Sequence, residues 1–406
     1  MSQAPRRPAR LPDAVALYLL ASVVVTLLAA SSAPTPLYGT YQAMWGFSPI
    51  TTTVVFGVYA VSVLVSLLVL GKLSDHVGRR PVLLVSLLVQ VAAMVVLATA
   101  TGVGSLIAAR VVQGVATGAA IGALGAGMLD LDARRGQLAN AVAPGVGTAV
   151  GALFSALLLT YVPGPLEQVY VVFIALFLAQ GVGVLFMRET VSPEPGALAS
   201  LKPEITLPRA VRSRVLTAAP VLFAVWALAG LYGALGPALE TKLSGDPSPV
   251  LGGLLVFSFA ATAAVAVFVL RRRPPEAVMR IGVSTLLVGV LVALLALSVP
   301  SLTLFFLGTA VSGVGFGAGF QGGIRTTLPL AQPHERAGVL SLLYVVSYLG
   351  FGVPAVGAGA LVVYGPGLFG ATRIYGAVVI VLALLALVRL VAAVRDRAAG
   401  PALSRL

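Results

Sequence analysis

Twelve long apolar segments, separated by short polar ones, follow one another along the chain. Each has about 20 residues or more, the length at which an α-helix crosses the roughly 30 Å hydrocarbon core of a bilayer. We expect membrane-spanning helices over residues 14–34, 50–70, 81–101, 104–128, 137–160, 168–187, 213–236, 248–270, 280–299, 302–325, 337–363 and 372–392. The pattern therefore predicts an all-α membrane protein with no folded domain outside the membrane.

The composition fits a membrane protein and excludes several kinds of site. Of the 406 residues, 59% are hydrophobic and 10% are charged, whereas soluble domains carry about 25% charged residues. The chain contains no Cys, which excludes disulfides, thiolate zinc sites and cysteine nucleophiles. It has two His residues and no phosphate-binding G-x-x-x-x-G-K-[ST] loop. We therefore expect no metal and no cofactor.

The basic residues are concentrated on one side of the predicted membrane. The exceptions are Lys242 and Arg373, on the other side, and Arg110, within a span. Because Lys and Arg accumulate in cytoplasmic loops, the net charge of +13 indicates orientation rather than nucleic-acid binding. We expect both termini in the cytoplasm. The preference for Arg over Lys and the abundance of Ala are typical of a GC-rich genome and suggest the inner membrane of a bacterial cell.

A charged, proline-bearing stretch divides the spans into six and six. We expect an N-terminal six-helix bundle over 1–187, a cytoplasmic linker over 188–212 and a C-terminal six-helix bundle over 213–406. A short repeat supports duplication, since Thr-Ala-Val-Gly-Ala at 148–152 returns as Pro-Ala-Val-Gly-Ala at 354–358, in the corresponding spans. Parallel six-helix repeats are a known transporter plan, so we expect two pseudo-symmetric bundles.

The loop between the second and third spans carries charges in a fixed pattern. Residues 71–81 read Gly-Lys-Leu-Ser-Asp-His-Val-Gly-Arg-Arg-Pro. Gly78 permits a positive backbone dihedral, as a tight turn requires. Asp75 is a single carboxylate among three basic side chains, which predicts a network of ion pairs rather than a merely solvated loop.

This loop resembles the signature motif of the major facilitator superfamily, G-x-L-x-D-x-x-G-R-R-P. The matching residues are Gly71, Leu73, Asp75, Gly78, Arg79, Arg80 and Pro81. The resemblance implies an intracellular gate formed by Gly71, Asp75, Gly78, Arg79 and Arg80. Such a gate pairs the two bundles when the protein faces outward and breaks when it opens inward. Ion pairs of about 1 kcal/mol each are enough to bias a two-state equilibrium.

The fourth span contains a charged residue, in the sequence Arg-Val-Val-Gln-Gly over 110–114. A charge at mid-bilayer costs on the order of 3 kcal/mol, so Arg110 must face protein or water. Gln113 lies on the same helical face. The segment is similar to the fourth-span motif of the same superfamily, whose arginine is implicated in proton coupling. Snorkelling of Arg110 to the outer head groups is the alternative interpretation.

The first span contains no acidic residue, although drug exporters of this type commonly carry one there. Glu240 and Asp13 lie near the ends of predicted spans and Asp75 lies in a loop, so no acid is expected deep in the membrane. The candidate coupling residues are Arg110, Gln113, Asp75 and Glu240. The fifth span, with Pro144, loosely resembles the antiporter motif of the superfamily.

Aromatic and polar side chains near the midplane are the candidate substrate contacts, because transporters of this plan bind substrates between their bundles. The candidates are Ser31, Ser32, Phe56, Tyr59, Trp226, Tyr232, Phe316, Phe320, Gln321, Tyr344, Ser347 and Tyr348. For each of them, packing against a helix or lipid is the alternative. A cavity of rings and hydroxyls with few charges suits a hydrophobic or amphipathic small molecule.

Together these patterns predict a monomeric secondary active transporter that exports drug-like or metabolite molecules, in exchange for protons. An importer or facilitator of a neutral nutrient such as a sugar is the first alternative. A membrane sensor that keeps the fold without transporting is an alternative of another class. An intramembrane enzyme would need paired acids or histidines deep in the spans, and the sequence has none, so we expect no enzymatic activity.

Overall fold

The computed structural model describes residues 10–403, and twelve helices in this range are long and apolar enough to cross a membrane. They are α1 (Asp13–Ser32), α3 (Pro49–Leu70), α5 (Arg79–Ala98), α6 (Val103–Leu131), α7 (Ala133–Tyr161), α8 (Pro165–Leu185), α9 (Arg209–Ser244), α10 (Pro249–Leu270), α11 (Pro275–Ser298), α12 (Leu302–Thr327), α13 (Arg336–Tyr364) and α14 (Gly367–Leu403). Each corresponds to one predicted segment, so the prediction of an all-α protein with twelve spans is confirmed. Arg6, Arg7 and Arg405, which contribute to the predicted charge asymmetry, lie outside the described residues.

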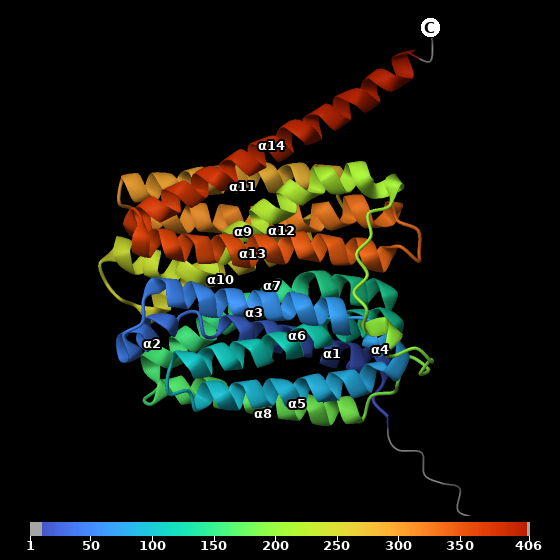
Figure 1. Cartoon of the computed structure of the whole chain (residues 1–406), viewed down its shortest axis with the longest axis horizontal. Coiled ribbons are helices and arrows are strands. Elements are labelled where there is room, and N and C mark those ends of the chain that lie inside the picture. The colour runs from blue at the N-terminus through green and yellow to red at the C-terminus, as the bar shows by residue number, and fades with distance from the viewer. Residues whose placement is uncertain (1–9, 404–406) are drawn as a thin grey trace, which may run out of the picture.

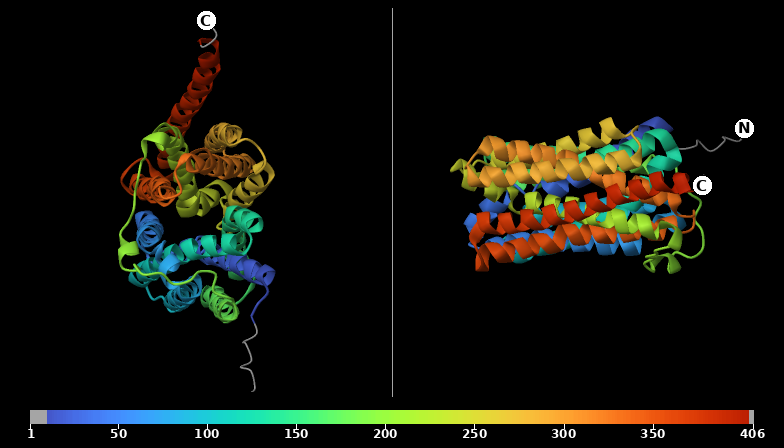
Figure 2. Two further views of the ribbon diagram at one scale, coloured as in Figure 1. Left: turned by 90° about the vertical axis from the view of Figure 1, so that its right-hand side faces the viewer. Right: turned by 90° about the horizontal axis from the view of Figure 1, so that it is seen from above.

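The twelve helices form two bundles of six that lie side by side (Figure 1). The first six run blue to green and the last six yellow-green to red, and an end-on view separates the two groups (Figure 2). Buried apolar side chains form one core within residues 16–187 and another within residues 218–390. Phe56 is the residue of the first bundle that belongs to the second core. The predicted two-bundle fold is therefore confirmed.

Four short elements were not part of the prediction. Two are α-helices, α2 (Tyr38–Trp45) after α1 and α4 (Leu73–Val77) before α5, and two are single 3-10 turns, η1 (Ala199–Leu201) and η2 (Leu328–Leu330). The linker runs past α4 at one end of the molecule, on the right in Figure 1. We call this the linker end and the opposite one the far end. Helix α2 lies at the far end (Figure 1).

The linker is attached to both bundles. The side chain of Lys72, next to α4, forms an ion pair with Glu204 of the linker. Two residues later, the backbone N–H of Thr206 donates to the carbonyl of Gly338 on α13, at 3.3 Å. The linker therefore connects the two bundles by non-covalent contacts as well as by the chain itself.

The seventh span is longer than the sequence pattern predicts. Helix α9 continues through Pro237 to Ser244, rather than ending near residue 236. A proline inside a membrane helix is tolerated when neighbouring helices cover the freed backbone groups, and Gly252 of α10 packs against Pro237. As a result Glu240, expected near the end of a span, lies within α9 and is 0% exposed.

The bundles touch mainly along two pairs of helices, α3 with α13 and α7 with α10, and α3 also contacts α9. Small residues allow the close approach. A Cβ atom added to Gly57 of α3 would lie 2.9 Å from Cγ2 of Val356, and one added to Gly145 of α7 would lie 3.0 Å from Cβ of Ala264. The closest approaches between the bundles therefore lie on these helices.

Glycines also bring α11 and α12 together inside the second bundle. A Cβ atom on Gly315 would lie 2.6 Å from the backbone N of Leu286, and one on Gly308 would lie 2.6 Å from that of Ala293. Backbone atoms cannot move aside to make room for a Cβ atom, whereas the end of a flexible side chain can. These positions therefore require glycine for steric reasons.

We expect Gly315→Ala to lower the melting temperature of the purified protein. Overpacking a dense interior typically costs about 1–3 kcal/mol. The matched control is Gly357→Ala in α13, where a Cβ atom would meet nothing within 4 Å. That substitution removes the entropic cost of a helical glycine, about 0.5–1 kcal/mol, and should leave the melting temperature equal or higher. Equal melting temperatures for the two variants would contradict the packing of α11 on α12.

Candidate functional site

Five aromatic rings gather in the C-terminal bundle beside the interface with the first bundle. The ring of Trp226 on α9 lies 5.0–5.6 Å, centroid to centroid, from four others. We call this group the aromatic cluster; its members are Trp226, Phe316, Phe320, Tyr348 and Phe351. From the first bundle, Phe56 on α3 reaches Phe351 at 4.7 Å. The cluster therefore belongs to the second bundle and contacts the first bundle through Phe56.

Helical spacing explains how these rings meet. Residues three or four apart lie on one face of a helix, as Phe316 and Phe320 do on α12 and Tyr348 and Phe351 on α13. The ring of Tyr344, one turn before Tyr348, is 6.4 Å from it. Two polar atoms beside these rings, Trp226 Nε1 and the hydroxyl oxygen of Ser347, are buried without a hydrogen-bond partner. The site thus offers aromatic surface together with unsatisfied polar groups.

Three of the predicted substrate contacts have other neighbours. Tyr232 packs on Phe259, 5.1 Å away, rather than on Trp226. The side-chain amide of Gln321 donates to a carbonyl of α10 at 3.3 Å. The hydroxyl of Ser32 donates to a carbonyl of α7 at 2.9 Å. In this conformation these side chains hold helices together, and they lie outside the aromatic cluster.

Arg110 on α6 is buried inside the first bundle and is 1% exposed. Its guanidinium donates to the carbonyl of Ser31 (3.0 Å) and to Oε1 of Gln113 (2.6 Å), and it lies 4.3 Å from the centroid of the Tyr59 ring. Within residues 10–403, no carboxylate forms an ion pair with it. The side chain therefore points into the protein, and snorkelling to the head groups is not its role here.

Neutral groups complete the surroundings of Arg110. The hydroxyls of Tyr59 and Ser31 share a hydrogen bond of 2.7 Å. The amide of Gln113 donates to the carbonyl of Ala30 at 3.1 Å. In the described part of the chain, the buried hydroxyls of Tyr38 and Thr117 form no hydrogen bond of normal geometry. The sequence pattern did not identify these last two residues, because neither carries a charge nor belongs to a motif.

The tyrosines of α2 remain neutral well above physiological pH. Burial raises the pKa of Tyr38, although the positive charge of Arg110 acts in the opposite direction. Burial also raises the pKa of Tyr41 to about 12. The hydroxyl of Tyr41 lies 2.9 Å from that of Tyr170 on α8. Neither α2 tyrosine therefore supplies a negative charge to balance Arg110.

Glu240 is the one acidic residue among the fully buried side chains of the described region. Within residues 10–403, its carboxylate oxygens form no hydrogen bond of normal geometry, although the side chains of Thr241 and Ser244 lie nearby on the same helix. An ionised carboxylate without a partner is very costly to bury. The environment therefore favours the protonated, neutral side chain, and Glu240 is suited to bind and release one proton.

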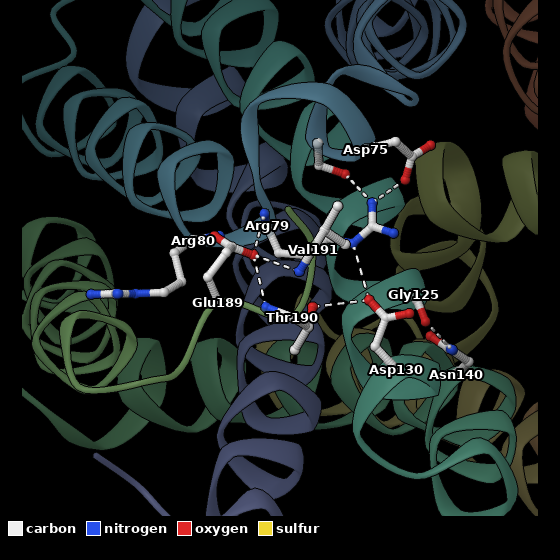
Figure 3. Close-up of polar contacts among 10 residues, drawn as sticks. Asp75, Arg79, Arg80, Gly125, Asp130, Asn140, Glu189, Thr190 and Val191 are labelled. Atoms are coloured by element: carbon white, nitrogen blue, oxygen red, sulfur yellow. Dashed lines mark hydrogen bonds and ion pairs between the residues drawn. The ribbon is translucent and has the colours of Figure 1, made fainter. Parts of the chain in front are cut away.

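At the linker end, Arg79 is the centre of a charged network (Figure 3). Its side chain is only 7% exposed and forms an ion pair with Asp75. Its Nε lies 3.3 Å from Oδ2 of Asp130 on α6, and it donates to the hydroxyl of Ser74 at 2.7 Å. One guanidinium thus joins α4, α5 and α6.

Glu189, at the start of the linker, caps the first turn of α5. Its carboxylate accepts from the backbone N–H groups of Arg79 (2.8 Å) and Arg80 (3.0 Å), as Figure 3 shows. The N-terminus of a helix stabilises such an acceptor. Gly78, with φ of +99°, turns the chain into α5, and a Cβ atom there would lie 2.7 Å from Glu189 Oε2. Thr190 extends the network by donating to Asp130 at 2.9 Å.

The partners of this network all belong to the first bundle and the linker. The side chain of Arg80 donates to the carbonyls of Val184 (3.3 Å) and Leu185 (2.5 Å) on α8. Within residues 10–403, Asp75 and Arg79 have no hydrogen bond or ion pair with the second bundle. In this conformation the loop holds its own bundle together and leaves the other bundle free at this point.

Comparison with known proteins agrees with the architecture. The nucleoside transporter NupG superposes with a TM-score of 0.67 at 14% sequence identity, over 92% of this chain and 98% of that one. A mutant of NupG gives 0.69 at 13% identity, over 92% and 99%. The human organic anion transporter MFSD10 (TETRAN) gives 0.66 at 18% identity, over 94% and 100%. At such identities the likeness shows the fold alone.

Sequence comparison identifies the family. No curated protein matches the chain. The model of the family described as Major Facilitator Superfamily matches residues 19–283, more than half of the sequence. The match includes the loop of residues 71–81, Arg110 and Gln113. The chain therefore belongs to the major facilitator superfamily of membrane transporters.

Proposed function

We propose that the protein is a secondary active transporter that exports hydrophobic or amphipathic small molecules, in exchange for protons. The observation that carries this proposal is the aromatic cluster. It lies beside the bundle interface, reaches Phe56 of the other bundle and contains the unpartnered Nε1 of Trp226. Aromatic surface with a few polar groups is typical of sites for amphipathic molecules. The remaining contacts in this proposal are Ser31, Tyr59, Tyr344 and Ser347.

The proposal places the linker end in the cytoplasm, where most of the Lys and Arg residues would then lie, in a monomer of the bacterial inner membrane. Exposure along α3 supports an inward-facing conformation. Gly57 is packed against α13, whereas Val61 and Val65, which follow at helical spacing toward the linker end, are each 54% exposed. The bundles then close at the far end and separate toward the cytoplasm.

Gating in this proposal uses the loop of residues 71–81. The inward-facing state leaves Asp75 without a partner on the second bundle. When the linker end closes, Asp75 gains such a partner and the transporter opens outward. Gly71 and Gly78 allow the helix ends to approach, and a Cβ atom added to Gly122 of α6 would lie 2.5 Å from the backbone oxygen of Gly71. Arg79 and Arg80 keep the loop in position.

Proton coupling in this proposal centres on Glu240. The neutral side chain is compatible with its buried position, and ionisation requires the site to open to water. A proton is therefore bound on one side of the membrane and released after the bundles move. Arg110 and Gln113 form the second candidate coupling site, because a change in charge near a buried guanidinium shifts the balance between conformations.

The alternatives fit the cluster less well. A sugar site needs several hydrogen-bonding side chains, whereas rings dominate here. A sensor would need the bundles to remain in one arrangement. NupG is a nucleoside transporter and MFSD10 an organic anion transporter, so this fold accommodates more than one class of organic molecule. Those activities belong to those proteins.

The test uses membrane vesicles and three fluorescent probes that share one ring system: dansylglycine, its amide, and N-dansylethylenediamine. We expect energised inverted vesicles that contain the protein to accumulate at least one probe. An uncoupler should abolish the accumulation, and vesicles without the protein should show none. Accumulation only in right-side-out vesicles would favour the importer, and binding without movement would favour the sensor. Either result would overturn the proposal.

A further inference from the structure

We propose that Arg110 binds the negatively charged group of the substrate, so that the exported molecules are amphipathic organic anions. This inference rests on the proposed function, because it specifies the charge of the molecule that the aromatic cluster takes. Three observations support it, namely an unbalanced buried charge, unused hydrogen-bond donors around it, and its position relative to the aromatic cluster.

The positive charge of Arg110 is unbalanced. In the described part of the chain, every ion pair is formed by a basic residue other than Arg110. Most of these ion pairs lie near the linker end. The guanidinium is held by a carbonyl, an amide oxygen and a ring face instead, all of them neutral. A buried charge is ordinarily paired with an opposite one. A bound anion would supply the missing partner.

Unused donors surround the guanidinium. Within residues 10–403, Nε of Arg110 is buried without a hydrogen-bond partner, and the buried hydroxyls of Tyr38 and Thr117 form no hydrogen bond of normal geometry. The hydroxyl of Tyr38 lies near the guanidinium of Arg110, and that of Thr117 lies near the hydroxyl of Tyr59, so weak contacts are all that these two groups have. Buried donors without partners are rare in proteins. A carboxylate accepts about four hydrogen bonds through its two oxygens and would satisfy these groups together.

Tyr59 links this group of donors to the aromatic cluster. Its ring covers the guanidinium, and its hydroxyl lies on the side of α3 that faces Tyr348 of the opposite bundle, near enough for a charge on one hydroxyl to act on the other. One turn away on α3, Phe56 packs on Phe351 of the cluster. A ring bound in the cluster would direct an attached carboxylate toward Tyr59. Turning Tyr59 aside breaks its hydrogen bond to Ser31 and exposes Arg110 to that carboxylate.

Such a ligand would touch both bundles at once. Its ring would lie against α9, α12 and α13, and its charged group would lie against α6. Binding would then depend on the relative position of the bundles, as alternating access requires. A neutral or cationic molecule of the same shape would lack the contact with α6.

The test measures binding of the three dansyl probes to purified protein, without any gradient. Trp45→Phe leaves Trp226 as the one tryptophan, so energy transfer to dansyl reports binding at the cluster. We expect dansylglycine to bind at least about tenfold more tightly than its amide, because a charge-assisted hydrogen bond contributes about that much affinity. N-dansylethylenediamine should bind no more tightly than the amide. Arg110→Gln should remove the preference for dansylglycine, and Arg110→Lys should keep part of it.

Arg373→Gln is the matched control, because within the described range 10–403 Arg373 also has no carboxylate partner and donates to the carbonyl of Leu297 at 3.2 Å. It should leave the preference unchanged. Equal affinities for the three probes, or tightest binding of the ammonium probe, would overturn the inference even if vesicles transport them. If Arg110→Gln does not fold, the order of affinities of the three probes for the protein that keeps Arg110 still tests the inference. Full displacement of dansylglycine by chloride at constant ionic strength would assign the site to an inorganic anion and also overturn it.

Discussion

Glu240→Gln is expected to abolish accumulation driven by a proton gradient while the protein stays folded. Glutamine matches the shape and neutrality of the protonated side chain, which the buried position favours. It cannot exchange a proton. With a gradient of one pH unit, one exchanged proton supports about tenfold accumulation, equivalent to about 1.4 kcal/mol. We expect this factor to fall to one in inverted vesicles, whereas exchange of labelled for unlabelled probe continues.

The control for this variant is Glu167→Gln. Glu167 lies in the first turn of α8, at the far end of the first bundle, and is exposed. Its replacement should leave both gradient-driven accumulation and exchange unchanged. Accumulation by Glu240→Gln at the level of the unaltered protein would remove Glu240 from the coupling mechanism. Loss of exchange with a normal melting temperature would assign Glu240 to substrate movement instead.

Arg79→Ala is expected to lower both the melting temperature and the rate of exchange. The substitution removes the contacts to Asp75, Asp130 and Ser74 at once. Hydrogen bonds to charged groups contribute about 1.5–3 kcal/mol when buried, and the value here is at the lower end because Asp75 is half exposed. The exchange rate falls because the loop no longer holds Asp75 in the position that the closed linker end requires.

The neighbouring residue provides the comparison. Arg80→Ala removes side-chain contacts to two helix-end carbonyls and no ion pair. We expect a loss of stability below about 1 kcal/mol and a smaller change in exchange rate. Thermal melting and exchange in proteoliposomes measure both effects. If the two alanine variants behave alike, Arg79 has no special role in the network.

The hydrophobic pattern predicts all twelve spans because a bilayer sets their length and composition. The pattern does not predict features that depend on tertiary contacts. Helix α9 continues past Pro237 because α10 covers it. The short helices α2 and α4 are too short and too polar for the pattern to mark.

The candidate site is predictable only in part for similar reasons. Spacing along α12 and α13 brings Phe316, Phe320 and Tyr348 together, and the buried position of Arg110 follows from the cost of a charge in lipid. Glu189 and Thr117 have no such local signal. Glu189 meets Arg79 across 110 residues of sequence, and that proximity results from packing.

The most direct test of alternating access uses the absence of cysteine in the natural sequence. Spin labels on cysteines at Arg135 and His334 report the linker end, and labels at Tyr161 and Tyr364 report the far end; all four residues are exposed. Pulsed distance measurements across a pH titration, with and without dansylglycine, should show two distances in each pair. The account predicts that the linker-end pair shortens as the far-end pair lengthens. Distances that stay fixed, or that change in the same direction at both ends, would contradict it.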